Sequence, residues 1–137
     1  MTITISNYHI EEELSRSSRT IIYRAWRDSD NTRVIIKTLN NDYPSNHDLT
    51  RFKHEFHMIK KMAGAAGVVQ MHEQIKYGNN LALVLEDFKG ISLHDYLAQT
   101  DPDLEHLLRI AIDISRGLGS IHRQNMIHKD INPSNIL

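Results

Sequence analysis

The chain has no cysteine, no long apolar run and almost no net charge, and each absence excludes a class of protein. Without cysteine it forms no disulfide and no thiolate metal site, which fits a cytoplasmic location. No apolar stretch approaches the roughly 18 residues of a membrane-spanning helix, and Met1–Ile10 lacks the features of a secretion signal. The formal net charge is -1, so there is no basic footprint for nucleic acid. We therefore expect neither a membrane span nor a nucleic-acid partner.

What the sequence does contain is the balance of a soluble globular protein. Its 137 residues are 40% hydrophobic and 24% charged, which is enough for one domain with a buried core. The 9 histidines are many for this length, and His54 and His57 stand three apart on an expected helix. No third ligand has a suitable spacing, so we favour a solvated helix face over a zinc site.

Short runs rich in β-branched and aromatic residues predict strands in the first part of the chain. Turn formers at Asp28–Asn31 and at Gly78–Asn80 separate two pairs of these runs. The expected strands are Tyr8–Leu14, Thr20–Arg27, Arg33–Leu39, Val68–Tyr77 and Leu81–Glu86.

Apolar residues at helical spacing predict a helix between the third and fourth of these strands. Ser45 and Asp48 form an S-x-x-D start, and the apolar spacing continues through Ala63. The segment Gly64–Gly67 then breaks the pattern.

Two further helices are expected in the last third of the chain. The first is Ser92–Ala98, with Ser92 and Asp95 as another S-x-x-D start. A longer one opens at Thr100–Asp103 with Pro102 in its first turn. Strands followed by helices indicate an α+β fold class. The longer helix carries one continuous apolar stripe, made of Leu104, Leu107, Leu108, Ala111, Ile114, Leu118 and Ile121.

The final segment has the pattern H-x-D-x-x-x-x-N followed by two aliphatic residues. Phosphoryl transfer needs a carboxylate that orients the proton of the attacking hydroxyl, and Asp130 can supply it. It also needs oxygen ligands for Mg²⁺, and the Asn135 amide oxygen can supply one. Pro133 fixes its own φ and restricts Asn132, which helps the loop to turn back. A plain turn is the alternative, because Asp, Asn, Pro and Ser are all turn formers.

A lysine and a glutamate upstream can belong to the same site. Lys37 leaves the apolar strand Val34–Ile36, and Glu55 follows it by 18 positions inside the first expected helix. Taken singly, each is an ordinary solvated charge. Together they can form an ion pair that aims Lys37 at the α- and β-phosphates of a nucleotide.

Lys37, Glu55, the stretch Leu83–Gly90 and the terminal loop follow one another in the order and spacing of a protein kinase. The chain resembles the amino-terminal half of a eukaryotic-like (Hanks-type) serine/threonine protein kinase domain. More narrowly, the segments Asn7–Ile10, Ser17–Ala25 and Leu85–Leu97 resemble those of kinase domains that open bacterial (cyanobacterial-type) hybrid multi-sensor signalling kinases.

The resemblance implies a protein-kinase-like fold with two lobes. The first lobe, residues 1–86, would hold a five-stranded antiparallel sheet and one helix, which that family calls αC. Residues 87–137 would hold the hinge, two helices and the catalytic loop of a truncated helical lobe.

The resemblance also implies phosphoryl transfer from ATP-Mg²⁺ to a protein hydroxyl in a full-length parent. Its partners would be a protein substrate and the remainder of the second lobe or downstream signalling modules. Catalytic roles would fall to Lys37, Glu55, Asp130 and Asn135, with Asn135 also binding the metal. Leu85 would be the gatekeeper beside the base. Nucleotide-binding roles would fall to Ser15, Ser17, Thr20, Ile22, Lys37, Leu85, Glu86, Phe88 and Ser92, where Glu86 and Phe88 use backbone groups and Ser92 meets the ribose.

Several positions depart from the family pattern. Ser15, Ser17 and Thr20 stand where the family has the glycines of its phosphate-covering loop. Their side chains crowd the close approach that glycine allows, but their hydroxyls can donate hydrogen bonds to phosphate, so we expect a weaker or altered grip on nucleotide. Lys129 replaces an arginine, and it lacks the bidentate fork that binds a phosphorylated activation loop. Asn132 stands where a lysine commonly meets the γ-phosphate, and losing that cation would cost transition-state stabilisation.

No Asp-Phe-Gly triplet follows the terminal loop within the 137 residues. We therefore expect catalysis of the full-length parent and not of this chain by itself. Part of the apolar stripe of the longer helix should face water, and the chain should be poorly soluble, oligomeric or dependent on a partner. Two alternatives stay open, a pseudokinase-like lobe that binds nucleotide or a partner without transfer, and a small-molecule phosphotransferase of the aminoglycoside-kinase type. The kinase-like hinge stretch Leu85–Leu97 favours a protein kinase over the latter.

Overall fold

The computed structural model describes residues 3–129 and 131–137, which form two units along the chain. The sheet unit consists of Met1–Ala63 and Val69–Asp87. The helical unit consists of Gly64–Val68 and Phe88–Leu137. Each unit has its own internal packing.

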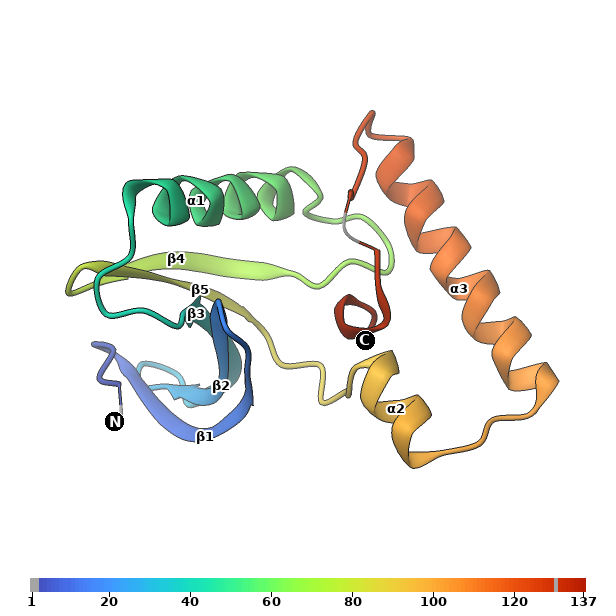
Figure 1. The fold of residues 1–137 in the computed structure, drawn as a ribbon, viewed down its shortest axis with the longest axis horizontal. Helices are drawn as coiled ribbons and strands as arrows, with labels where there is room; N and C mark the ends of the chain where they lie inside the picture. Colours follow the sequence, from blue (N-terminus) through green and yellow to red (C-terminus); the bar gives the residue numbers. More distant parts are fainter. Residues whose placement is uncertain (1–2, 130) are drawn as a thin grey trace. The chain divides into compact units, whose positions relative to one another are not determined.

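A five-stranded antiparallel sheet forms most of the sheet unit, with strand order β1-β2-β3-β5-β4 (Figure 1). Strands that follow one another along the chain pair mostly as hairpins, and β5 inserts between β3 and β4. The strands are β1 (Tyr8–Arg16), β2 (Thr20–Arg27), β3 (Thr32–Leu39), β4 (Met71–Tyr77) and β5 (Asn80–Glu86).

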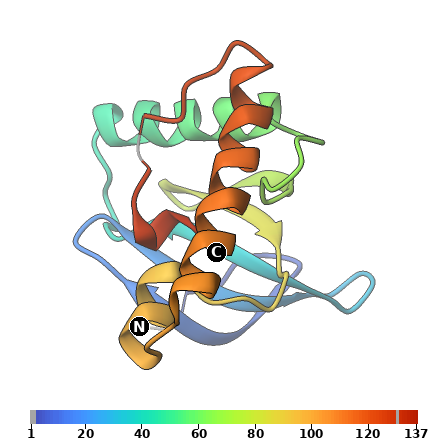
Figure 2. The same cartoon turned by 90° about the vertical axis from the view of Figure 1, so that its right-hand side faces the viewer.

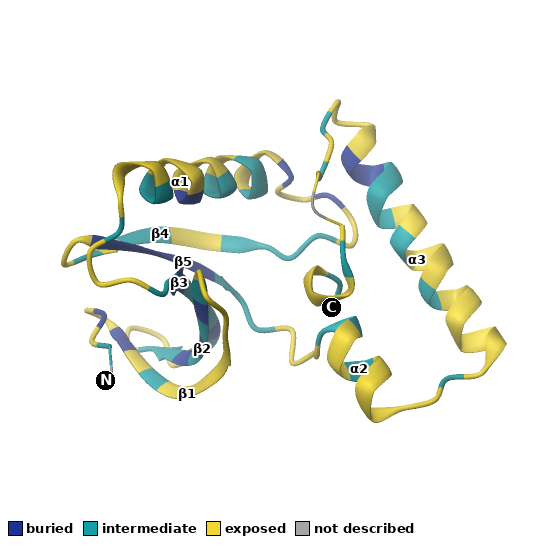
Figure 3. Cartoon of the chain, viewed as in Figure 1, coloured by how far each residue is buried: buried dark blue, intermediate teal, exposed yellow. Residues whose placement is uncertain are grey.

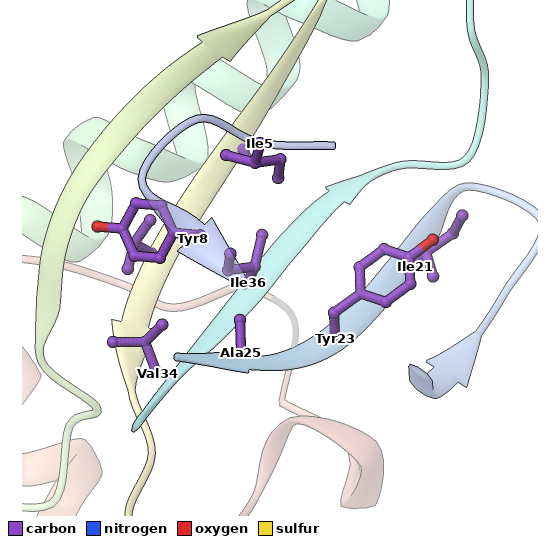
Figure 4. Close-up of a cluster of buried hydrophobic side chains, with 9 residues drawn as sticks. Ile5, Tyr8, Ile21, Tyr23, Ala25, Val34 and Ile36 are labelled. Carbon is purple, nitrogen blue, oxygen red and sulfur yellow. The ribbon is translucent and has the colours of Figure 1, made fainter. Parts of the chain in front are cut away.

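One face of this sheet carries the main apolar core. Alternate residues of β2 and β3 point to this face, as period-2 strands require, and Ala25, Val34 and Ile36 are fully buried there. The amino-terminal segment completes the core with Ile5 and Tyr8 (Figure 4). The strand register is thereby fixed, because a slip of one residue would expose this whole set to water.

The opposite face is covered by α1 (Asn46–Lys61), which both ribbon views show running along the sheet (Figures 1 and 2). Phe52 is the buried residue of this helix and packs on Leu81 and Leu83 of β5. Ser45 caps the helix with Asp48 in a capping box, as the S-x-x-D pattern predicts. The cap fixes where α1 begins and therefore which of its residues face β3.

The helical unit contains α2 (Leu93–Gln99), α3 (Leu104–His122) and the short 3₁₀ helix η1 (Pro133–Asn135). The Leu93 amide donates a 2.7 Å hydrogen bond to the Ile136 carbonyl, so the end of the chain is tied to the start of α2. Most of α3 is exposed (Figure 3), including Leu104, Leu107 and Leu108 of its apolar stripe. The expected exposure of this stripe is therefore present.

The five strands, three α-helices and α+β class agree with the expectations from sequence, whereas several boundaries differ. Strand β4 begins at Met71 and not at Val68. The first helix ends at Lys61 and not at Ala63. Pro102 is not in the first turn of α3, because Asp103 is the N-cap and its side chain accepts from the His106 amide. Within the described residues, no helix is both long and apolar enough to cross a membrane.

Candidate functional site

An ion pair between β3 and α1 is the first feature of the candidate site. Lys37 Nζ lies 2.5 Å from Glu55 Oε1. Both side chains keep some exposure to solvent, 23% for Lys37 and 37% for Glu55. The expected pair is thus formed, and it holds the lysine ammonium in a defined position on a surface that a ligand can reach.

Lys37 shares its face of the sheet with apolar side chains from both neighbouring strands. Ile22 of β2 and Leu83 of β5 are its direct cross-strand partners. The next row on that face consists of Arg24, Ile35 and Leu85. The structure therefore brings together four of the expected residues of the sheet unit, Ile22, Lys37, Glu55 and Leu85. An ammonium group flanked by aliphatic side chains suits a ligand with a flat apolar part and an anionic part.

The turn between β1 and β2 contains the serines and threonine that replace glycines. Ser15 lies at the end of β1 opposite Ile22. The Ser17 hydroxyl accepts hydrogen bonds from the backbone amides of Arg19 and Thr20, at 3.2 and 2.9 Å. Sequence reasoning gave these hydroxyls a donor role toward phosphate. The structure shows the Ser17 oxygen instead bound to two amides of its own turn.

Asn40 holds this turn from the end of β3, and sequence reasoning did not identify it. Its amide nitrogen donates to the Ser17 carbonyl at 2.8 Å, and its backbone amide donates to the Arg19 carbonyl, also at 2.8 Å. Arg16 donates to its side-chain oxygen and forms a bidentate pair with Glu13. That hydrogen bond from Arg16 keeps the pKa of Glu13 below its ordinary value. The turn is thus fixed by side chains rather than by glycine.

The end of β5 is anchored on both sides. The Glu86 amide donates to the Gln70 carbonyl at 2.9 Å, and the Glu86 carboxylate accepts from the Gln70 amide at 2.7 Å. From the other side, Arg24 Nε donates to Asp87 Oδ2 at 2.9 Å. The charged Arg24 within an apolar strand is the only signal in the sequence that could have suggested this contact. Its partner follows 63 positions later, too far for any local pattern.

The remaining expected residues lie in the helical unit. Ser92 is the N-cap of α2, and its hydroxyl accepts from the Asp95 amide and donates to the Asp95 carboxylate. Phe88 is 43% exposed, and its ring lies against Gly90. A Cβ added to Gly90 would come within 2.0 Å of the ring, so this glycine is required by the Phe88 position.

The terminal loop is described except for one of its residues. Asp130, the expected catalytic carboxylate, lies outside the described residues. Asn132 caps η1 by accepting from the Ser134 amide at 3.0 Å, and Asn135 ends η1. Through the bond between Leu93 and Ile136, this loop lies beside the N-cap of α2. The structure therefore brings Asn135 near Ser92, although the two are far apart in the sequence.

The residues fit a nucleotide better than a free metal ion. The described residues include no group of three or more His, Cys, Asp or Glu side chains that could hold a metal ion. Asn135 offers one amide oxygen, and Mg²⁺ in such sites takes its other ligands from substrate phosphates and water. A metal bound by Asn135 would thus arrive together with phosphate groups.

Comparisons with known proteins match the chain to protein kinases. The sequence profile described as protein tyrosine and serine/threonine kinase matches residues 8–137. A probable serine/threonine-protein kinase of Clostridium acetobutylicum is 25% identical over 99% of the chain and 21% of its own length. The serine/threonine-protein kinase PknL of Mycobacterium tuberculosis is 26% identical over 96% of the chain and 33% of its own length. A serine/threonine-protein kinase of Mus musculus, ULK4, is 30% identical over 97% of the chain and 10% of its own length. The chain therefore spans less than half the length of these relatives.

Proposed function

Because the chain belongs to the protein tyrosine and serine/threonine kinase family, we propose that it is the nucleotide-binding part of a serine/threonine protein kinase domain. The full-length protein would transfer the γ-phosphoryl group of ATP to a protein hydroxyl. The observation that carries the proposal is the Lys37–Glu55 pair on a sheet face that also presents Ile22 and Leu85. We assign residues 1–86 to the first lobe and residues 87–137 to the hinge and the beginning of the second.

In this proposal the sheet unit and Phe88, which follows it in the chain, bind the adenine and the phosphates. Ile22 and Leu85 contact the adenine, and backbone groups of Glu86 and Phe88 recognise its edge. Lys37 neutralises charge on the α- and β-phosphates while Glu55 keeps its ammonium in place, which is positioning and electrostatic stabilisation rather than covalent chemistry. The turn with Ser15, Ser17 and Thr20 would cover the phosphates.

The helical unit would supply the remaining groups. Ser92 contacts the ribose, Asn135 provides an oxygen ligand for Mg²⁺, and Asp130 orients the attacking hydroxyl of the protein substrate. When bound, Mg²⁺ neutralises developing charge on the phosphates. Asn135 would contribute only an uncharged amide oxygen as a metal ligand, so carboxylate ligands for the metal would have to come from other residues.

Nucleotide binding by the 137-residue chain tests this proposal directly. We expect ATP with Mg²⁺ to raise the melting temperature of the wild-type chain. Lys37→Met keeps an unbranched side chain but removes the ammonium, and it should abolish most of the shift. Lys76→Met is the matched control, because Lys76 is an exposed lysine on β4 of the same sheet. No shift of the wild-type chain at millimolar ATP, or an equal loss in both variants, would reject the proposal.

A further inference from the structure

We propose that Arg24 is a positioning residue for base recognition, because it fixes Asp87 at the point where the chain leaves the sheet unit. This inference rests on the proposed function, in which backbone groups of Glu86 and Phe88 meet the adenine. The contact itself lies wholly within the sheet unit. It joins the middle of β2 to the residue that follows β5.

The strand register shows how Arg24 reaches this point. Arg24 pairs with Ile35 of β3, and Ile35 pairs with Leu85 of β5. The guanidinium therefore crosses one whole strand, roughly 10 Å at the usual spacing of neighbouring strands. It meets the carboxylate two residues beyond Leu85, on the sheet face that also carries Lys37. An arginine side chain is long enough for this span, and its stem can lie along the Ile35 side chain.

Burial makes this ion pair different from the other ion pairs of the sheet. The Asp87 side chain is 3% exposed and the Arg24 side chain 20%. By comparison, Arg33 and Glu11 form a pair on the same sheet with exposures of 33% and 35%. A carboxylate removed from water needs a charged partner, so Asp87 is held where Arg24 can reach it. The exposed pair imposes no such restriction on its backbone.

Arg24 itself is held by a second carboxylate. Its Nη1 forms an ion pair with Glu12 of β1. Glu12 thus restrains the guanidinium from the edge of the sheet while Asp87 is bound on the inner side. On the β4 side, the two hydrogen bonds between Glu86 and Gln70 hold the residue before Asp87. Two successive residues are therefore fixed from opposite directions, which leaves the backbone that follows with little freedom at its start.

The proposed consequence concerns the base and not the phosphates. Hydrogen bonds to the adenine edge depend on the orientation of the peptide groups from Glu86 to Phe88, and small misplacements are costly in such sites. Lys37 lies two residues from Ile35 along β3, and its ion pair is with Glu55 and not with either partner of Arg24. Loss of the Arg24 contact should therefore weaken the binding of adenine nucleotides while leaving the affinity for a bare triphosphate unchanged.

The first experiment needs no nucleotide. Backbone ¹⁵N order parameters of Asp87 and Phe88 would be measured in the wild-type chain, in Arg24→Gln and in the matched control Arg33→Gln. We expect values near 0.85 in the wild type and the control, and values below about 0.6 in Arg24→Gln. Arg24→Lys keeps the charge and should restore part of the order. Values that stay near the wild-type level in Arg24→Gln would overturn the inference.

The second experiment separates this inference from the proposed function. Dissociation constants for ATP and for inorganic tripolyphosphate would be compared in the same variants. We expect Arg24→Gln to weaken ATP binding about tenfold, which corresponds to about 1.4 kcal/mol, with no change for tripolyphosphate. Equal weakening of both ligands would overturn a role in base recognition. A wild-type chain that binds no ATP would reject the proposed function, and with it the base-recognition role, whatever the order parameters show.

A double variant guards against loss of the fold. Arg24→Gln removes the positive charge that pairs with the buried Asp87 carboxylate, and the chain can unfold for that reason alone. Arg24→Gln combined with Asp87→Asn replaces the ion pair by two neutral amides that can still bond to each other. We expect this double variant to be folded, with order parameters and ATP affinity closer to the wild type than those of the single variant. A folded double variant that binds ATP as poorly as Arg24→Gln would overturn the inference.

Discussion

Glu55 Oε1 lies 2.5 Å from Lys37 Nζ, so a carboxylate of α1 determines where the only lysine of β3 points. Helix α1 is itself fixed at its start by the Ser45 cap and at its centre by Phe52. The pair therefore links the position of the helix to the position of the charge that would meet phosphate.

Glu55→Gln should separate the functional from the structural contribution of this pair. Because both side chains are partly exposed, we expect the free energy of unfolding to fall by no more than about 1 kcal/mol. Binding of ATP should weaken about tenfold, since the lysine loses its charged partner and its fixed orientation. The measurements are urea denaturation and titration of ATP with Mg²⁺.

Glu105→Gln is a suitable control for this change, because Glu105 pairs with Arg109 on exposed α3. It should leave ATP binding unchanged. An ATP affinity of Glu55→Gln equal to that of the wild type would show that the pair does not serve the nucleotide.

Ser17→Ala should strengthen the binding of nucleotide phosphates. In the wild type, the Ser17 oxygen accepts from the amides of Arg19 and Thr20, and backbone amides are the donors that phosphate-binding loops use. Removing the hydroxyl frees both amides, while the Asn40 contacts still hold the turn. We expect ATP affinity to rise a few fold and adenosine affinity to stay the same, as measured by titration calorimetry.

Ser18→Ala, in the same exposed turn, is the control and should change neither affinity. An ATP affinity of Ser17→Ala at or below that of the wild type would mean that the hydroxyl supports phosphate binding instead of competing with it.

Contacts between residues close in the sequence are the part of this structure that the sequence predicts well. The alternation in T-I-I-Y-R-A-W-R predicts β2 with the bounds that the structure has, because one buried face fixes a period of two. The S-x-x-D patterns likewise predict both cap residues, Ser45 and Ser92, because a cap is a contact between residues three apart. Such local relations can be read from neighbours alone.

Relations between distant residues were predicted only where a family pattern supplied them. Lys37 and Glu55 match a known spacing, and the structure shows their ion pair. Arg24 and Asp87 match none, and a charged residue in a strand carries no mark of its partner. The prediction for Pro102 was wrong for another reason. The sequence predicted Pro102 in the first turn of the helix, but the His106 amide donates to the Asp103 side chain, so Asp103 is the N-cap and Pro102 lies before the helix.

Gly90→Ala should displace the ring of Phe88. The new Cβ would lie 2.0 Å from Phe88 Cε2, far inside any tolerated contact, so either the ring or the backbone has to move. Forced overpacking of this kind costs roughly 1–3 kcal/mol, although an exposed ring can reduce that cost by rotating away. We expect a lower melting temperature and changed NMR shifts for the Phe88 ring protons.

Gly119→Ala is the opposite case within the helical unit. Its Cβ would meet only the end of the flexible Arg123 side chain at 3.5 Å, and alanine is favoured over glycine inside a helix by about 1 kcal/mol. We expect it to raise the melting temperature. A Gly90→Ala chain as stable as the wild type, with unchanged ring shifts, would contradict the close packing of Phe88 on Gly90.

Aspartates in the capping contacts of α1 and α3 should make helix stability depend on pH. Hydrogen bonds from Ser45 hold the pKa of Asp48 below its ordinary value, and the His106 amide does the same for the pKa of Asp103. A carboxyl with a lowered pKa in the folded state stabilises the fold above its ordinary pKa of about 3.9. That stabilisation is lost as the pH falls through the lowered value.

The double variant Asp48→Asn/Asp103→Asn should therefore melt at a lower temperature than the wild type at neutral pH. The two melting temperatures should converge only as the pH falls below the ordinary pKa and through the lowered values, because the wild-type carboxyls then become neutral as well. Asp101→Asn changes an exposed aspartate outside the helices. It is the control, and its melting temperature should show no such convergence with that of the wild type. If the melting temperatures of the wild type and the double variant differ by the same amount from neutral to acid pH, the charges of Asp48 and Asp103 play no part.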